Sequence, residues 1–582
     1  MPDQPDGVPA PSPYTVAVVG LGGTGLALVR RLAGAGLTVV GVDDDPAALG
    51  RVRDLSPSER PRTLTRFPAG VATADLVIES VPEPAALKRL VLAKVRRHLR
   101  PGTPVLTTAL TTSLADLEEA AGPDLFALRF LRADDLDAVE VARAARAGDA
   151  AAERVDRILT AAGITAHRVV DRPGSLAPGL LLGLLNRAAW MVHDGYATAE
   201  DVDTAMRLGC GWREGPLAVL DAIGLDTARD LLSRLAETAD GHTSPAPVLD
   251  ELIARGALGR KTGRGFHRHD RGAAPGRPAE PTAPPGRRVV VVGSGTMATG
   301  IAESFVRGGF DTTLLARTEE KARAAAERVE FALQRTRTTV EAGTGADTGE
   351  EPGESRFTAT ADRSVLVAVD LVVEAVVEDL EVKRALFAEL GEVCAPRTLL
   401  ATSTSSLSVA DCTEPAGRPA DVLGLHFFNP APVMRLVELV PAEGTSAHNL
   451  ARARAVAERL GKQAVRCGDR AGFIVNALLF PYLNQALELL DAQETTTAAL
   501  DAAARGVGGQ PLGPVRLLDT VGADVALEVQ RRLHADPRCR APRSAPLLEQ
   551  LVSARHLGRK TPGKSARTYL ASRAAAPVPA TV

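Results

Sequence analysis

The sequence has no excess of either charge and no basic block. It carries 68 Lys and Arg against 71 Asp and Glu, which gives a formal charge of −3. A surface that binds nucleic acid or an anionic membrane needs concentrated positive charge. We therefore expect neither nucleic acid nor a membrane as a partner.

Cysteine is scarce as well, with five residues in 582. They lie far apart, no two have the spacing of metal ligands, and their number is odd: Cys210, Cys394, Cys412, Cys467 and Cys539. This pattern argues against a disulfide framework and against a metal site, and it favours a reducing compartment.

Long apolar runs are also missing. No uninterrupted stretch reaches the length of a transmembrane helix. Residues 1–13 contain neither Lys nor Arg and no apolar core, so they read as a proline-rich disordered tail and not as a signal peptide. We expect a soluble, cytoplasmic protein.

What the sequence does contain is enough apolar material for several cores. Its 582 residues are 45% hydrophobic and 24% charged, as in folded globular proteins. At usual domain sizes this length corresponds to roughly three to five domains.

The sequence repeats itself once. Four pairs of fragments recur in the same order, at 15–25 and 288–298, at 75–81 and 370–376, at 215–216 and 513–514, and at 259–262 and 558–561. The offset is 273 from Gly20 to Gly293, rises to 295 at the second pair and then stays nearly constant. Such offsets indicate a tandem duplication, with an extra segment near the start of the second copy.

Within each copy the pattern of hydrophobic residues changes once. The first part alternates β-branched runs with helical stretches, which is typical of a parallel sheet covered on both faces, and the second part has helical periodicity. The predicted fold class is α/β plus all-α, in two tandem units. The expected boundaries are a tail at 1–13, α/β and helical domains at 14–172 and 173–268 (unit 1), a Pro/Gly linker at 269–286, α/β and helical domains at 287–470 and 471–570 (unit 2), and a tail at 571–582.

Both units open with a strand, a glycine-rich turn and a helix. The turn residues are Gly20, Gly22 and Gly25 in unit 1, and Gly293, Gly295 and Ala298 in unit 2. The first glycine allows the tight turn, the second lets a pyrophosphate approach the backbone, and the third position must be small for helix packing. Both turns predict Rossmann-type dinucleotide sites, and a turn that binds nothing is the alternative.

The end of the second strand selects the cofactor, because it contacts the ribose. In unit 1 it carries Asp43, whose carboxylate would bond both hydroxyls of NAD. Unit 2 has Ala316, Arg317 and Thr318 instead, so no carboxylate repels a 2′-phosphate and a guanidinium is there to pair with it. We expect unit 2 to prefer NADP(H), with NAD left open. Arg317 as a solvated residue at a helix start is the alternative.

One segment of unit 2, GLHFFNPAPVMRLVELV at 424–440, is specific. It resembles the signature of the L-3-hydroxyacyl-CoA dehydrogenase family and its 3-hydroxybutyryl-CoA relatives. The resemblance extends through 373–383, 402–408, 472–484 and 558–563, and it covers 287–570 well and 14–268 more weakly. It implies that each unit is a Rossmann domain followed by the helical C-terminal domain of this family, an oxidoreductase of fatty acid metabolism.

The resemblance also implies roles for single residues. His426 matches the catalytic base of the family, and Glu438 matches the carboxylate that orients it. Imidazole suits proton exchange near neutral pH, and a partnered carboxylate fixes its tautomer. Ser405 and Asn476 match positions that bond the substrate oxygen and hold the reacting carbons, and Asn429 matches one that supports the histidine and the nicotinamide. Turn or capping roles stay open for these three residues.

Two further residues match family positions beside the cofactor. These are Glu378 and Lys383, although their spacing also fits an exposed helix face. Ser403 precedes Thr404 where the family usually has Asn, which leaves the geometry near the nicotinamide in question.

The extra segment of unit 2, at about 320–357, falls where the family carries a helical hairpin over the CoA. Arg335 and Arg337 are therefore candidates for contacts with CoA phosphates. A plain surface helix is the other interpretation.

Unit 1 keeps the frame but lacks the catalytic residues. Arg129, Arg132 and Pro178 stand opposite His426, Asn429 and Asn476, whereas Glu83 and Lys88 are retained. Arg stays protonated and cannot act as a general base, so we expect unit 1 to be silent, with NAD binding left open. Since helical domains form the family's dimer interface, unit 1 is predicted to be an in-chain partner in a pseudo-dimer. Further oligomerisation is open.

The predicted function is interconversion of (S)-3-hydroxyacyl-CoA and 3-ketoacyl-CoA of the 3-hydroxybutyryl and acetoacetyl type, by hydride transfer with NAD(P). With NADPH, reduction is the favoured direction. One alternative is a related dehydrogenase that acts on acyl groups of acyl carrier protein or on free hydroxy acids. The other is a catalytically silent nucleotide-binding scaffold.

Overall fold

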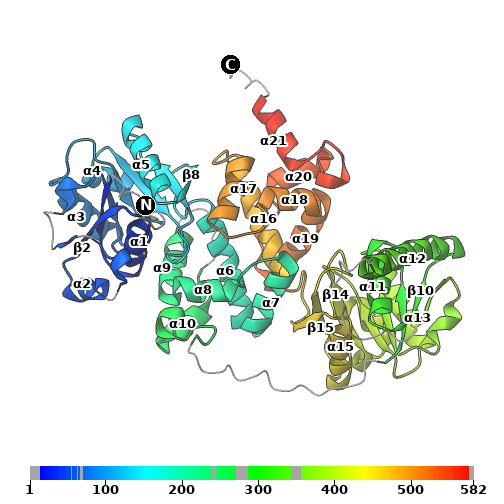
Figure 1. Ribbon diagram of the computed structural model, residues 1–582. Coiled ribbons are helices and arrows are strands. Elements are labelled where there is room, and N and C mark those ends of the chain that lie inside the picture. The colour runs from blue at the N-terminus through cyan, green and yellow to red at the C-terminus, as the bar shows by residue number, and fades with distance from the viewer. Residues whose placement is uncertain are drawn as a thin grey trace, which may run out of the picture.

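The computed structural model describes residues 14–53, 55–61, 63–65, 70–237, 244–269, 286–341 and 356–575. The predicted tail at 1–13 and almost all of the predicted linker lie outside these ranges. Figure 1 shows an α/β domain at each side of the molecule and the helices α6–α10 and α16–α20 between them.

The α/β domain of unit 1 is built on an eight-stranded sheet in the order β3-β2-β1-β4-β5-β6-β7-β8. Neighbouring strands are parallel except β6 and β7, which are antiparallel. The strands are β1 Thr15–Val19, β2 Thr38–Val42, β3 Thr63–Thr65, β4 Leu76–Glu79, β5 Val105–Thr107, β6 Leu125–Arg129, β7 Ala138–Arg143 and β8 Thr165–Val169, and the helices are α1 Gly23–Gly34, α2 Pro46–Val52, α3 Ala85–Arg96, α4 Ala115–Ala121 and α5 Asp149–Ala161.

Side chains alternate between the two faces of a strand, and both faces of this sheet are buried. In β1, Val16 and Val18 belong to one apolar cluster, whereas Ala17 and Val19 belong to another. The continuous β-branched run of β1 is therefore explained by packing on both sides.

The α/β domain of unit 2 repeats this topology, in the order β11-β10-β9-β12-β13-β14-β15-β16, with β14 and β15 antiparallel. Its strands are β9 Arg288–Val292, β10 Asp311–Leu315, β11 Phe357–Thr360, β12 Leu371–Glu374, β13 Leu399–Thr402, β14 Val422–Phe427, β15 Leu436–Pro441 and β16 Gln463–Arg466, and its helices are α11 Thr296–Arg307, α12 Glu319–Glu341, α13 Leu380–Val393, α14 Val409–Thr413 and α15 Ala447–Arg459.

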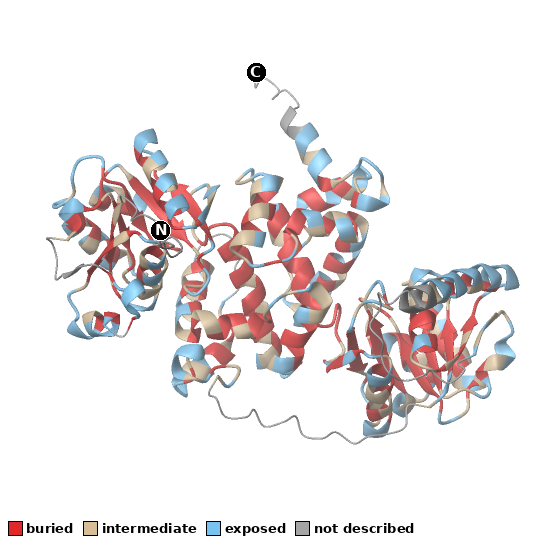
Figure 2. Cartoon of the chain, in the orientation of Figure 1, coloured by how far each residue is buried: buried red, intermediate tan, exposed pale blue. Residues whose placement is uncertain are grey.

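The helical parts of the two units pack against each other. Unit 1 contributes α6 Ala177–His193, α7 Ala199–Cys210, α8 Pro216–Ile223, α9 Leu225–Ala236 and α10 Pro247–Ala254, and unit 2 contributes α16 Val475–Asp491, α17 Thr497–Gly506, α18 Pro514–Val521, α19 Ala523–Ala535, α20 Pro546–Ser553 and α21 Ala566–Ala575. The long apolar helices α6 and α16 are in contact, and one apolar core spans both sets of helices. Figure 2 shows this core as a nearly continuous buried region.

Each helical part also contacts the sheet of the other unit. Helix α7 of unit 1 lies against β15 and β16 of unit 2, and α17 of unit 2 lies against β7 and β8 of unit 1. The two contacts use corresponding elements, with the two units exchanged, and Figure 1 shows both.

The predicted fold class is confirmed, with two differences in detail. The sheets are not fully parallel, because β6–β7 and β14–β15 each reverse direction. Helix α21 runs to Ala575, into the segment expected as a tail, and residues 576–582 lie outside the described ranges. In the described part of the chain no helix is long and apolar enough to cross a membrane. All five cysteines are described, and each is a free thiol.

Candidate active site

The glycine-rich turn of unit 2 has room for a pyrophosphate. Gly293 has a φ of 139°, and a Cβ at this position would lie 2.4 Å from the carbonyl oxygen of Ala375. Gly295 precedes α11 and offers no side chain to its first amides, and a Cβ there would meet no described atom within 4 Å. Ala298 is fully buried against the turn. The open space at Gly295 and the uncapped start of α11 suit an anionic diphosphate.

The end of β10, which is expected to contact the ribose, is followed by Arg317 and has no acidic residue before Glu319. Ala316 is buried after β10, and Arg317 and Thr318 are exposed before α12. The Thr318 hydroxyl accepts a hydrogen bond from the Lys321 amide at 3.3 Å. The sequence interpretation missed Arg328, which reaches back from α12 and donates to the carbonyl oxygen of Ser294 at 2.6 Å.

His426 and Glu438 face each other across the antiparallel strands β14 and β15. Nδ1 of His426 lies 2.6 Å from Oε2 of Glu438, and the two side chains are 7% and 0% exposed. Oε1 of Glu438 accepts hydrogen bonds from the amides of Ile474 and Val475, at 3.1 and 3.0 Å. These amides begin α16, and a helix N-terminus stabilises an anion. Both carboxylate oxygens are therefore fixed.

The imidazole ring is held between two aromatic rings. The centroid of His426 lies 4.6 Å from that of Phe428 and 5.4 Å from that of Phe473. Phe473 has a φ of 50°, an unusual value for a non-glycine residue. Among the described residues none hydrogen-bonds to Nε2 of His426. A proton fixed on Nδ1 by the carboxylate leaves Nε2 as the nitrogen that can exchange a proton.

Ser405 and Asn476 approach the same region from the two domains of unit 2. Nδ2 of Asn476 donates to the carbonyl oxygen of Ser405 at 3.2 Å. The Ser405 amide and hydroxyl both donate hydrogen bonds to Oε1 of Glu378, at 2.9 and 3.2 Å. The loop after β13 is therefore tied to Glu378 on one side and to α16 on the other.

Glu378 is an ionised carboxylate in a partly buried place. Burial opposes its ionisation, but the Lys383 ammonium and the donors of Thr404, Ser405 and Ser406 outweigh it and lower the pKa of Glu378 to about 2. Nζ of Lys383 lies 3.4 Å from Glu378 and 2.7 Å from Glu374.

One interpretation left open for Lys383, an exposed helix face, is wrong. Its side chain is 1% exposed, because it points from α13 into the sheet and pairs with the buried Glu374. Unit 1 repeats this arrangement, with Nζ of Lys88 at 3.1 Å from Glu79.

Three other predicted residues lie in the turn after β14 and on α12. Asn429 is exposed in the turn after β14, and no described residue joins it to His426. Arg335 is exposed on α12, where its guanidinium lies over the ring of Phe331. Arg337 lies on the same helix, and its side chain is outside the description.

A further residue at the site, Arg532 on α19, was missed by the sequence interpretation. Its guanidinium donates to the hydroxyl of Ser406 at 2.9 Å and to the carbonyl oxygen of Glu378 at 3.4 Å. It therefore bridges the helical and α/β domains of unit 2. The signal was present in the repeat, since Arg234 stands at the matching place on α9 of unit 1.

Comparison with protein families gives matches in both units. The NAD binding domain of 3-hydroxyacyl-CoA dehydrogenase matches residues 288–470. The C-terminal domain of the same enzyme matches twice, at 176–269 and 472–568. These segments make up more than half of the sequence. The chain belongs to the 3-hydroxyacyl-CoA dehydrogenase family. The NAD binding domain of 6-phosphogluconate dehydrogenase matches residues 15–122.

Similar proteins agree with this assignment. A 3-hydroxybutyryl-CoA dehydrogenase of Mycobacterium tuberculosis is 39% identical over 285 residues, which are 49% of this chain and 98% of that protein. The 3-hydroxyadipyl-CoA dehydrogenase of Escherichia coli is 41% identical over 241 residues, which are 41% of this chain and 50% of that protein. A crystal structure of 3-hydroxybutyryl-CoA dehydrogenase from E. coli, 18% identical, covers 93% of this chain and 98% of its own with a TM-score of 0.59. It shows that the two-unit fold is shared.

The resemblance predicted from the sequence is thus confirmed, and so is the class of enzyme. This 3-hydroxyacyl-CoA dehydrogenase is an oxidoreductase with a nicotinamide dinucleotide cofactor. Its activity is of the 3-hydroxyacyl-CoA and 3-hydroxybutyryl-CoA dehydrogenase kind.

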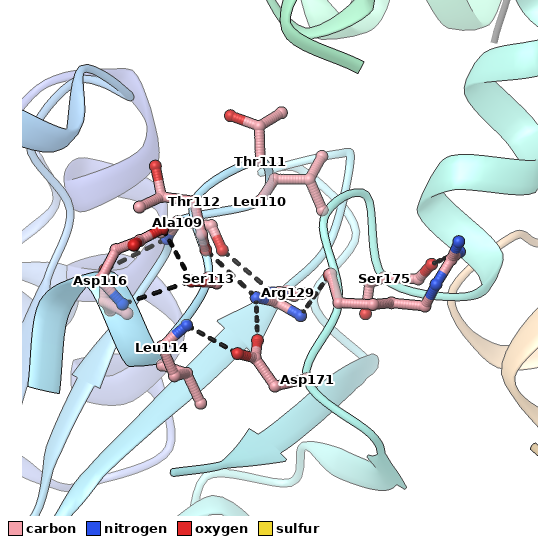
Figure 3. A network of polar contacts seen from close by, with 12 residues as sticks. Ala109, Leu110, Thr111, Thr112, Ser113, Leu114, Asp116, Arg129, Asp171 and Ser175 are labelled. Atoms are coloured by element: carbon pink, nitrogen blue, oxygen red, sulfur yellow. Dashed lines mark hydrogen bonds and ion pairs between the residues drawn. The ribbon is translucent and has the colours of Figure 1, made fainter. Parts of the chain in front are cut away.

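In unit 1 of the dehydrogenase, an internal ion pair takes the place of the histidine. Arg129 stands opposite Glu140 on β6 and β7, as His426 stands opposite Glu438. Its guanidinium lies 2.6 Å from Asp171 and donates to the carbonyl oxygens of Ala109 and Arg172 at 3.0 and 2.8 Å (Figure 3). The side chain is fully buried, so it ties loops together and cannot reach a ligand.

A large cavity is nevertheless present in unit 1 of the dehydrogenase. It has a volume of about 1660 Å³ and lies between the α/β domain and helices α8 and α9. Its lining includes Gly20, Gly22, Asp43 and Glu83. Leu110 is the counterpart of Ser405. Its amide donates a hydrogen bond to Oε1 of Glu83 at 2.9 Å, as the Ser405 amide does to Glu378.

Proposed function

We propose that unit 2 is the catalytic unit, with His426 as general acid and base and Glu438 as its orienting carboxylate, and that it reduces short 3-ketoacyl-CoA thioesters with NADPH. The observation that supports this most is the buried contact of 2.6 Å between Nδ1 of His426 and Glu438, which leaves Nε2 unbonded among the described residues. A carboxylate fixed by two amides can stabilise the imidazolium without moving.

The proton chemistry follows from this arrangement. When bound, the reduced nicotinamide supplies the hydride for the carbonyl carbon. As the carbonyl oxygen gains negative charge, the imidazolium of His426 gives it the Nε2 proton and becomes neutral imidazole. Glu438 keeps the Nδ1 proton in place throughout. In the oxidative direction the same Nε2 takes the proton of the hydroxyl group.

Ser405 and Asn476 are proposed to hold the substrate beside this nitrogen. Both lie in the network around Glu378, and the Asn476 amide already spans the two domains by its bond to Ser405. A hydroxyl and an amide are suitable donors for a carbonyl oxygen. We further propose that Asn429 supports His426 and the nicotinamide. Arg335 and Arg337 of α12 are proposed to bind the phosphates of CoA.

The activity is tested by following NADPH oxidation with acetoacetyl-CoA, acetoacetyl groups on acyl carrier protein, and free acetoacetate. We expect the CoA thioester to have the highest kcat/KM. A higher kcat/KM with the carrier-protein thioester or with the free acid would show that this compound, and not the CoA thioester, is the preferred type of substrate. Absence of turnover with all three would favour a silent nucleotide-binding protein.

The dinucleotide is proposed to bind at the turn with Gly293, Gly295 and Ala298. The choice between NADP and NAD is proposed to depend on Ala316, Arg317 and Thr318, because Ala316 replaces the aspartate of unit 1. Arg328 supports this preference as a second cation at the same turn. The double variant Ala316→Asp, Arg317→Ala introduces the carboxylate of unit 1 and removes the guanidinium. We expect the ratio of kcat/KM for NADPH to that for NADH to fall by roughly tenfold or more, since about 1.4 kcal/mol corresponds to a factor of ten. An unchanged ratio would contradict the preference.

Unit 1 is proposed to bind a second dinucleotide without chemistry. Its cavity is lined by Gly20 and Gly22, which precede Gly25 in the turn, and by Asp43, whose carboxylate suits a ribose with both hydroxyls free, as in NAD. Isothermal titration with NADH and NADPH should find two nucleotides per chain in total. Asp43→Ala should lower the number to one, whereas Asp44→Ala, next to it, should keep two. A single nucleotide in the wild type would refute this second site.

A further inference from the structure

The first unit touches the second unit directly behind the proposed dyad. Gly209 lies in the last turn of α7, and a Cβ there would be 2.9 Å from Cγ2 of Val475 and 3.0 Å from Cδ2 of Leu436. Val475 and Leu436 are 2% and 0% exposed. Only glycine lets α7 approach this closely, since any side chain would have to displace a packed residue.

Val475 is hydrogen-bonded directly to the carboxylate of Glu438. Its amide donates to Oε1 of Glu438 at 3.0 Å, and Oε2 of Glu438 holds Nδ1 of His426 at 2.6 Å. A shift of Val475 would therefore move the donor that fixes Glu438 and, with it, the imidazole. Small displacements of this kind are costly in catalysis.

A second contact between the units links the turn before α7, through the residues after β16, to β15, the strand that carries Glu438. The Tyr196 carbonyl accepts a hydrogen bond from the Gly468 amide at 3.0 Å, and Ala197 pairs with Cys467 as an antiparallel bridge. The Cys467 amide in turn donates to the carbonyl oxygen of Leu439, the neighbour of Glu438, at 3.2 Å. Gly468 is required here too, because a Cβ would lie 2.9 Å from the Tyr196 ring.

Two of the groups that unit 1 places near Glu438, Cys210 and Tyr196, are uncharged at neutral pH. Burial, with a smaller contribution from Glu438, raises the pKa of Cys210 to about 12. Burial also raises the pKa of Tyr196 well above its usual value. The cation on this side, Arg470, lies over the Tyr196 ring at 3.7 Å. Cys210 and Tyr196 therefore add close packing behind the dyad and no charge of their own.

We propose that unit 1 positions the catalytic carboxylate of unit 2, with Gly209 as the positioning residue that sets the place of Val475 and hence of Glu438. The silent unit is on this view a structural component of the active site. The proposal rests on the proposed roles of His426 and Glu438, and it goes beyond them by making unit 2 dependent on a residue some two hundred positions before its strand β14.

The duplication supplies a matched control. Gly506 on α17 is a closely packed glycine of the reverse contact, where a Cβ would be 2.5 Å from Nε2 of His167 and 3.0 Å from Cβ of Ala138. These two neighbours lie on β8 and β7, the strands beside and containing Glu140, whose cross-strand neighbour is Arg129 and not a histidine. A side chain at Gly506 therefore disturbs the contact between the units on the side away from the dyad.

The test compares Gly209→Leu with Gly506→Leu in the full-length chain, with NADPH and acetoacetyl-CoA. We expect Gly209→Leu to lower kcat by roughly tenfold or more with KM nearly unchanged, and to alter the pH profile of kcat, whereas Gly506→Leu stays within about twofold of the wild type. Adding Val475→Ala to Gly209→Leu makes room for the new side chain and should restore most of kcat. Thermal unfolding of all variants checks that they fold.

Equal kcat values for the two leucine variants would overturn the proposal, and so would a failure of Val475→Ala to restore the rate. If Gly209→Leu does not fold, Gly209→Ala and Gly506→Ala replace the pair, with a smaller difference of the same sign expected. Should His426→Ala retain full activity, the proposed dyad fails instead, so the two failures are distinguishable.

Discussion

Replacement of His426 by alanine should lower kcat for NADPH-dependent reduction of acetoacetyl-CoA about a hundredfold or more, the effect of removing a general acid. Nε2 of this ring is the proposed proton donor, and the methyl group of alanine has no proton to give in its place. Binding of NADPH, measured by fluorescence, should be nearly unchanged, since the glycine-rich turn is at the far end of the cofactor.

The control for this variant is His448→Ala. His448 is an exposed histidine in the first turn of α15, and its loss should leave kcat and KM unaltered. A His426→Ala enzyme with a rate within twofold or threefold of the wild type would remove the proposed mechanism.

The second large effect is expected for Glu438→Gln. A glutamine has one acceptor oxygen, so it can serve either the amides of Ile474 and Val475 or Nδ1 of His426, but not both. The imidazole would lose its orientation and the stabilisation of its charged form, as when the aspartate of a serine-protease triad becomes asparagine, which costs about 10⁴ in kcat. We expect a loss of kcat between about a hundredfold and that value, with little change in KM.

The matching variant in unit 1 is Glu140→Gln. Glu140 also accepts from two helix-start amides, those of Leu176 and Ala177, at 3.0 and 2.8 Å. Burial raises the pKa of Glu140 even though these amides and Ser175 donate to it. The exchange should therefore lower the melting temperature somewhat and leave kcat unchanged. Equal losses of kcat in both variants would show that the carboxylate matters for folding and not for proton transfer.

Much of the fold could be predicted because the duplication made each pattern visible twice. The β-branched run of β1 and the glycine-rich turn at Gly293 indicated a sheet with a dinucleotide turn. The reversal at β14 and β15 was not predicted, although it explains why His426 and Glu438 are twelve positions apart: the antiparallel register places them side by side. Strand direction depends on pairing partners, which periodicity within one strand does not reveal.

Other features depend on contacts between distant segments. The spacing of Glu378 and Lys383 fitted a surface helix equally well, and only the burial of Glu374 beneath α13 decides against it. The loss of the base at Arg129 was visible in the sequence, but its use as an internal tie to Asp171 was not. The importance of Gly209 has no signal in the sequence, because its neighbours lie in the other unit.

The contact between α6 and α16 joins two parts of one polypeptide. In a dimer of separate chains such a contact is lost when the protein is diluted below its dissociation constant. Here the covalent link holds the partners at an effective concentration that dilution does not change. The specific activity should accordingly be the same at nanomolar and micromolar enzyme, and no half-assembled form should accumulate in between.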